Sequence, residues 1–85
     1  MRVLIPSALL SYTAHASEVG AEGKDVGAML QDLERRYPGI RFRIVDEQDA
    51  IRPHMRVFVD GRPAVLATPI SPSASVAILM ALSGG

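Results

Sequence analysis

Residues 25–39 read DVGAMLQDLERRYPG, and this stretch decides the fold because it is the clearest helix in the chain. Asp25 can serve as the N-cap of this helix, and Pro38-Gly39 stops it. Apolar side chains recur at helical spacing, at Val26, Met29, Leu30, Leu33 and Tyr37. The helix therefore has one apolar face that belongs to the core.

The residues before this helix predict two strands. Residues 2–5 alternate in character and stop at Pro6, which is typical of a short strand. A loop over residues 7–17 then leads to a short second strand over residues 18–22.

Three further extended segments are expected after the helix. Residues 40–51 predict a short strand or extended segment that runs into a polar loop. Residues 55–65 predict a strand that is closed by a hairpin at Asp60-Gly61 and followed by a short return strand. The last strand covers residues 76–82. The order β-β-α-β-β-β indicates an α+β fold with one sheet and one main helix on one face.

Composition narrows the possible functions. The chain has 85 residues, 48% of them apolar, which fits one domain with a modest core. Its nine basic and nine acidic side chains cancel, so no overall field attracts nucleic acid or an anionic membrane. No apolar run is long enough to span a bilayer and no secretory segment is evident, so we expect a cytoplasmic protein without nucleic-acid or membrane partners.

Side chains suited to metal binding or catalysis are scarce. The chain has no cysteine, and its two histidines, His15 and His54, are far apart in sequence. The acidic run at residues 46–49 could hold a hard cation, but a solvated loop is the better interpretation. We therefore expect no metal site, no bound cofactor and no catalytic side chain.

Strand alternation predicts a sheet face that the helix does not cover. The side chains expected to point at the helix are those of Val3, Ile5, Val57, Val59, Val76 and Ile78. The side chains expected on the opposite face are those of Leu4, Phe58, Ala77 and Leu79. An exposed apolar patch usually marks a partner surface, so we interpret this face as partner-binding. The alternative is that the loop over residues 62–75 folds over it.

The C-terminal segment ends in Ser83-Gly84-Gly85, and residues 63–85 contain no ionisable side chain. Glycine lacks a Cβ, so a narrow channel can close around such a tail and reach the carbonyl carbon of the last residue. The alternative is a frayed terminus or a cloning remnant.

Three segments together resemble the MoaD/ThiS family of ubiquitin-like sulfur carriers. They are VGAMLQDLERRYPGI from residue 26, IRPHMRVFVDGRPA from residue 51, and TPI with SVAILMALSGG from residues 68 and 75. The resemblance implies a β-grasp domain over residues 1–82, with parallel first and last strands, and a flexible tail over residues 83–85. The acidic turn common in the family is replaced by residues 71–75, SPSAS, so no charged contact is carried over.

The resemblance also implies the chemistry of the tail. A MoeB/ThiF-like adenylating enzyme would use ATP and Mg²⁺ to activate the carboxylate of Gly85, which then becomes a thiocarboxylate. Gly84, Ser83 and Leu82 would be recognised with it. A sulfur-accepting enzyme for cysteine, thiamine, molybdopterin or a thiolated natural product would receive the sulfur. Two alternatives are a protein modifier joined through Gly85 to lysines, and a β-grasp interaction module whose tail is inert.

Overall fold

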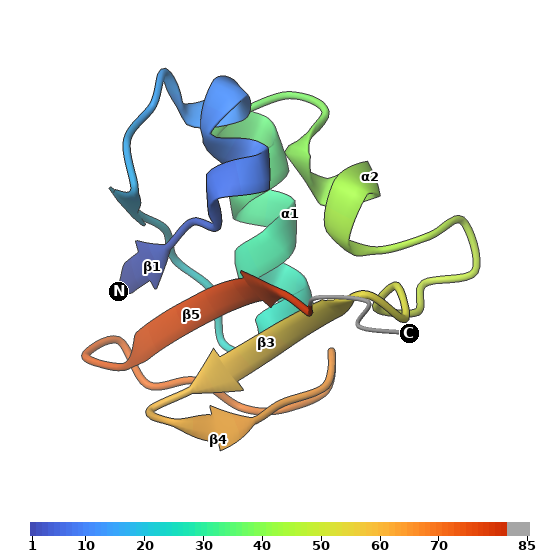
Figure 1. Ribbon diagram of the computed structural model, residues 1–85. Helices are drawn as coiled ribbons and strands as arrows, with labels where there is room; N and C mark the ends of the chain where they lie inside the picture. The colour runs from blue at the N-terminus through green and yellow to red at the C-terminus, as the bar shows by residue number, and fades with distance from the viewer. Residues whose placement is uncertain (82–85) are drawn as a thin grey trace.

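A five-stranded sheet in the order β2-β1-β5-β3-β4 forms the base of the molecule (Figure 1). The computed structural model describes residues 1–81 of the chain. Its strands are β1 (Arg2–Leu4), β2 (Glu18–Gly20), β3 (Met55–Val59), β4 (Arg62–Pro63) and β5 (Ser75–Met80). Its helices are the 3-10 helix η1 (Ser7–Thr13) and the α-helices α1 (Val26–Arg36) and α2 (Ile40–Ile44).

The two central strands are parallel and their neighbours are antiparallel. Val3 of β1 pairs with Val76 of β5 in the parallel ladder, while β3 and β2 flank this pair in the opposite direction. All three helices lie on the same side of the sheet (Figure 1). This mixed sheet with one main helix is the α+β, β-grasp arrangement that the sequence predicts, including the parallel first and last strands.

Helix α1 has the predicted signals at both ends. The side chain of Asp25 accepts a hydrogen bond from the N–H of Ala28 at 2.8 Å, which satisfies a donor at the helix start. The N–H of Tyr37 bonds to the carbonyl of Leu33, and Gly39 follows with a φ of 97°. This left-handed conformation favours glycine, so Gly39 lets the chain turn directly from α1 into α2.

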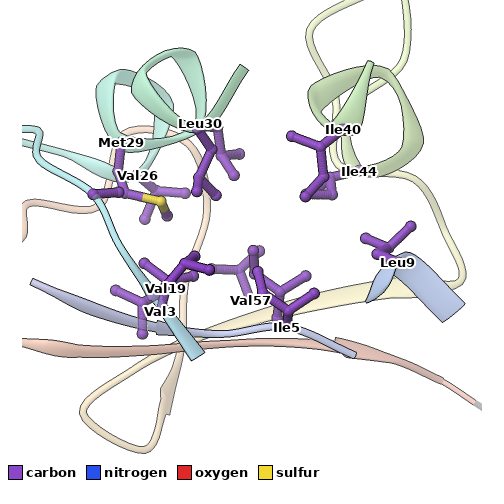
Figure 2. Packing of buried hydrophobic residues seen from close by; sticks show 14 of the residues in the cluster. Val3, Ile5, Leu9, Val19, Val26, Met29, Leu30, Ile40, Ile44 and Val57 are labelled. Carbon is purple, nitrogen blue, oxygen red and sulfur yellow. The ribbon is translucent and has the colours of Figure 1, made fainter. Parts of the chain in front are cut away.

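The core lies between α1 and the sheet (Figure 2). Met29 and Leu30 of α1 point towards Val3 of β1 and Val57 of β3, and all four are essentially inaccessible to solvent. Ile40 and Ile44 of α2 close one end of the core with Leu9 of η1. Burial of this apolar surface is the main stabilising contribution to the fold.

The predicted extended conformation of residues 40–51 is wrong at its start. Residues 40–44 form α2, which buries Ile40 and Ile44 on one face because they are four residues apart. The carboxylate of Glu34 accepts hydrogen bonds from the N–H groups of Gly39 at 2.8 Å and Arg41 at 3.0 Å. Helix α1 thereby stabilises the beginning of α2, an interaction between elements that no local pattern shows.

The predicted loop over residues 7–17 also contains a helix. Residues 7–13 form η1, which buries Leu9 and Thr13. The hydroxyl of Thr13 donates to the carbonyl of Ala16 at 2.7 Å and fixes the turn after η1. This short helix depends on burial of its side chains in the core rather than on helical periodicity.

Strand bounds differ from the prediction by a few residues. Strand β2 ends at Gly20 rather than at residue 22, and β5 runs from Ser75 to Met80. Leu82, the expected end of the last strand, lies outside the described residues. The hairpin at Asp60-Gly61 is confirmed, since both residues have positive φ, 50° and 82°, and Val59 pairs with Arg62 across the turn.

Candidate functional site

The last strand delivers the C-terminal segment from the centre of the sheet. Strand β5 lies between β1 and β3, and pairing with β3 continues to Met80, opposite Met55. One residue further, the N–H of Ala81 donates to the carbonyl oxygen of His54 at 2.7 Å. The chain therefore leaves the sheet beside the loop that leads into β3. The predicted tail residues Leu82, Ser83, Gly84 and Gly85 lie outside the described residues.

The four residues predicted for the open face are brought together on the side of the sheet away from the helices. Cross-strand pairing places Leu4 opposite Ala77, Ala77 opposite Phe58, and Phe58 opposite Pro63, so an apolar row crosses four strands. Leu79 lies two residues beyond Ala77 on the same face of β5. We call Leu4, Phe58, Ala77 and Leu79 the open-face patch.

Exposure within the open-face patch is uneven. Leu79 retains 47% and Leu4 retains 39% of the accessible surface, whereas Phe58 and Ala77 are half-buried. Leu4 and Leu79 thus provide most of the accessible apolar surface, and both flank the row centred on Ala77. The open-face patch is thus a partly solvent-exposed apolar surface, and surfaces of this kind usually bind partner proteins.

The loop after β4 does not cover this patch. It runs to the other side of the sheet, where the carbonyl groups of Leu66 and Thr68 accept hydrogen bonds from the N–H groups of Gly27 and Val26. Ile70 is buried in the core beneath the start of α1. The loop therefore closes the core on the helix side of the sheet. The alternative that residues 62–75 fold over the open face is wrong.

Charged groups border the patch without entering it. Arg2 and Glu18 form an ion pair with 3.6 Å between Nε and Oε2, and they lie on β1 and β2 next to Leu4. Arg56 pairs with Leu79 across β3 and β5, and its guanidinium donates to the carbonyl groups of Pro53 and Met55. The patch is therefore apolar in the middle, with arginine at its border.

The one strongly shifted acid lies far from this face. Asp32 on α1 is buried, and a hydrogen bond from Arg35, with further bonds from the N–H of Glu22 and from Arg36, lowers its pKa from 3.8 to about 2. These bonds attach the segment after β2 to α1. We interpret Asp32 as structural, because Arg35 and Arg36 bond to it within α1 and the N–H of Glu22 joins the segment after β2 to the same carboxylate.

Nothing in residues 1–81 groups three or more His, Cys, Asp or Glu side chains in a way that could hold a metal ion. The carboxylate of Asp46 accepts hydrogen bonds from the N–H groups of Gln48 and Ala50, and Asp49 pairs with Arg41 at 3.2 Å. The acidic run at 46–49 is thus engaged in its own turn and in a local ion pair.

One feature near the exit of β5 is absent from the sequence prediction. A pocket of about 250 Å³ is lined by Phe42, Arg43, Arg52 and His54. It forms because α2 and the segment before β3 meet, and the prediction of extended structure at residues 40–44 does not bring these side chains together. In the sequence, only the basic residues at 41 and 43 indicate that a basic site could form in this region.

Comparison with known proteins decides the family. The model of the ThiS family matches residues 3–85, which is nearly the whole chain. The chain belongs to the ThiS family. It is 35% identical over 89 residues to the sulfur carrier protein CysO of Mycobacterium tuberculosis, covering 98% of this chain and 96% of that protein. Members of this family are small protein co-substrates, so the chain is a co-substrate of other enzymes rather than a catalyst.

Solved structures agree with this membership. The crystal structure of M. tuberculosis CysO has a TM-score of 0.89 at 32% identity, over 95% of this chain and 98% of that chain. A chain of the Amycolatopsis orientalis BexX/CysO complex has a TM-score of 0.91 at 28% identity, over 99% of this chain and 98% of that chain. The small archaeal modifier protein SAMP1 of Haloferax volcanii, at 22% identity and a TM-score of 0.79 over 100% of this chain and 98% of that one, shows the shared fold alone.

In residues 1–81 no helix combines the length and the apolar character needed to cross a bilayer.

Proposed function

We propose that this ThiS-family chain is a sulfur carrier that transports sulfur as a thiocarboxylate on Gly85. The observation that carries the proposal is the match to CysO, a sulfur carrier protein, over 98% of this chain. The family match extends through Gly85, so the Gly84-Gly85 pair falls within the region that the family shares. The proposal is further supported by an apolar open face that lies on the same strand, β5, that leads to the C-terminal segment.

The chemistry begins with an unreactive group, because a carboxylate is a poor electrophile. A MoeB/ThiF-like enzyme would use ATP and Mg²⁺ to join the Gly85 carboxylate to the α-phosphate, with pyrophosphate as the leaving group. A sulfide-level donor would then attack the carbonyl carbon and release AMP. The product is a thiocarboxylate, a nucleophile that a sulfur-accepting enzyme can use.

The carrier's own contribution is access and chemical inertness. Gly84 and Gly85 have no side chains, so a channel that fits the backbone can bring the last carbonyl close to the reacting groups. The chain has no cysteine, so no thiol of its own can attack the activated carbonyl. Shielding of the acyl-adenylate from water falls to the partner's closed site.

Recognition is expected on the open-face patch. Leu79 on β5 lies two residues before Ala81, so a protein that covers the patch would also meet the chain where it leaves the sheet. Ordering a glycine-rich tail costs roughly 1–2 kcal/mol per residue, and burial of Leu4, Phe58, Ala77 and Leu79 can offset it. Leu82, Ser83 and Gly84 would then enter the partner's channel. The BexX/CysO complex supports the expectation of a protein partner, because a chain of similar fold is found there in a complex.

The sulfur would pass to a biosynthetic enzyme. Cysteine, thiamine, molybdopterin and thiolated natural products are the candidate products, and the likeness to CysO favours the cysteine pathway or a thiolated natural product. Since activation consumes ATP, we place the protein in the cytoplasm.

Truncation of the tail tests the proposal. Deletion of Gly85, or addition of one alanine after it, should abolish carrier-dependent pyrophosphate release by the cognate adenylating enzyme while the melting temperature stays unchanged. Arg62→Ala on β4 serves as a control that should be activated like the unaltered chain. Normal activation of either tail variant would refute the role of the Gly85 carboxylate. Peptides with Gly85 joined to lysine would indicate a modifier, and tail-independent binding through Phe58 would indicate an interaction module.

A further inference from the structure

A basic pocket lies between α2 and the segment that leads into β3. It is lined by Phe42, Arg43, Arg52 and His54 and has a volume of about 250 Å³. The guanidinium carbon of Arg52 lies 4.5 Å from the centroid of the Phe42 ring, and its Nε donates to the carbonyl of Phe42 at 2.7 Å. Stacking and hydrogen bonding thus hold the Arg52 guanidinium in one orientation.

The charge of this pocket is not balanced within residues 1–81. Neither Arg43 nor Arg52 forms a salt bridge with a carboxylate of the described residues, although the whole chain has no net charge. Of the nearby acids, Asp46 accepts hydrogen bonds in its own turn and Asp49 pairs with Arg41, while the exposed Glu47 forms no salt bridge with either pocket arginine. The other paired arginines are on β1 and α1, at Arg2, Arg35 and Arg36. The two guanidinium groups of the pocket are therefore not paired with a carboxylate within residues 1–81.

The pocket adjoins the exit of β5. His54 contributes to the pocket, and its carbonyl oxygen accepts the N–H of Ala81 at 2.7 Å. Figure 1 shows the end of β5 beside the segment that enters β3. At Ala81 the described chain therefore lies beside a residue that lines the pocket, and the two preceding residues, Leu79 and Met80, are exposed.

We infer that this pocket binds an aspartate or glutamate side chain on the surface of the protein that receives the tail. The inference rests on the proposed function for the existence of that protein. A carboxylate fits the two arginines by charge, and the Phe42 ring, which retains 57% of its accessible surface, can pack against the apolar part of the same acidic side chain or its neighbours.

A nucleic acid or free phosphate fits the pocket less well. The chain as a whole has no net positive charge to attract a long polyanion such as a nucleic acid. Free phosphate is favoured where several backbone N–H groups converge, whereas this pocket is formed by side chains, one of them aromatic. An acidic protein surface agrees with both observations.

A titration followed by NMR tests the inference without any activating enzyme. The ¹⁵N-labelled chain is titrated separately with a hexaglutamate peptide, inorganic phosphate and octauridylate. We expect hexaglutamate alone to shift the amides of residues 42, 43, 52 and 54 saturably, and the response to weaken as the salt concentration rises. An equal or larger response to phosphate or to octauridylate would overturn the inference.

Matched variants separate the pocket from general charge effects. Arg43→Glu removes an exposed pocket arginine and should weaken hexaglutamate binding about fourfold. Arg62→Glu makes the same change on an exposed arginine of β4, also unpaired within residues 1–81, and should leave binding unchanged. Equal losses in both variants would refute the pocket. Because no enzyme is present, this failure is distinguishable from failure of the Gly85 chemistry.

Discussion

The N–H of Ala81 lies 2.7 Å from the carbonyl oxygen of His54, and this hydrogen bond fixes the exit of β5 at the start of β3. Ala81 is thus held at a defined point beside the sheet, two residues after Leu79 of the open-face patch. Under the proposed function, a protein that docks on the patch would find the start of the C-terminal segment at a constant position.

Substitution of Gly84 tests whether the tail must lack a side chain at this position. Gly84→Val adds a β-branched side chain next to the reacting residue and should lower adenylation of Gly85 about tenfold or more, because a channel fitted to glycine excludes it. Pyrophosphate release by the adenylating enzyme measures the effect, and the melting temperature should not change. Activation of Gly84→Val at the normal rate would show that the tail is not threaded through a narrow channel.

The open-face patch can be tested with two exposed apolar residues. Leu79→Arg places a charge in the patch, and we expect the KM of the adenylating enzyme for the carrier to rise about tenfold, because the most exposed apolar contact of the patch is lost. Val65→Arg is the matched control, since Val65 is 63% exposed in the loop after β4 and Leu79 is 47% exposed. If both variants raise the KM equally, the patch is not the docking surface.

Asp32 makes stability depend on pH in a predictable window. Its pKa in the folded chain is about 2, below the usual 3.8, chiefly because Arg35 and the N–H of Glu22 bond to the charged carboxylate. A depressed pKa stabilises the fold above about pH 4, and this stabilisation is lost as the pH falls towards 2. Asp32→Asn should therefore lower the melting temperature at pH 6 more than at pH 2.

The control for this prediction is Glu47→Gln. Glu47 is an exposed acid and forms no salt bridge with residues 1–81, so its replacement should change the melting temperature little at either pH. A melting-temperature difference between Asp32→Asn and the unaltered chain that is as large at pH 2 as at pH 6 would contradict the electrostatic account of Asp32.

Gly23 is required by close packing against α1. A Cβ at this position would lie 2.4 Å from the backbone nitrogen of Met29, so Gly23→Ala must displace backbone and should cost about 1–3 kcal/mol of unfolding free energy. At Gly20, the nearest atom to such a Cβ is a backbone oxygen at 4.0 Å, and Gly20→Ala should cost less than about 0.5 kcal/mol. Urea denaturation measures both values, and equal costs would contradict the packing described at Gly23.

The sequence predicts the parts of the fold whose determinants are local. The cap at Asp25, the apolar spacing from Val26 to Leu33 and the Asp60-Gly61 turn all act within a few residues, and all three are confirmed. The alternation that assigns Leu4, Phe58, Ala77 and Leu79 to one face is also local, and the pairing of β1, β5 and β3 gathers these residues on that face.

The errors arise where contacts between elements decide the conformation. The start of helix α2 depends on hydrogen bonds that the N–H groups of Gly39 and Arg41 donate to the Glu34 carboxylate on α1, and a five-residue segment is too short to show helical periodicity. The pocket at Arg43 and Arg52 was missed for the same reason, since it exists only once α2 has formed. The chemistry of Gly85 was inferred from family resemblance and stays a proposal, as do the roles of the open-face residues.

The intact mass of the carrier tests the central claim most directly. The purified chain is incubated with its cognate adenylating enzyme, ATP, Mg²⁺ and sulfide, and its mass is then compared with that of the untreated chain. We predict a gain equal to the exchange of one oxygen for one sulfur, absent without ATP and absent when Gly85 is deleted. No gain in the unaltered chain, with an enzyme shown to load another carrier, would contradict the assignment as a sulfur carrier.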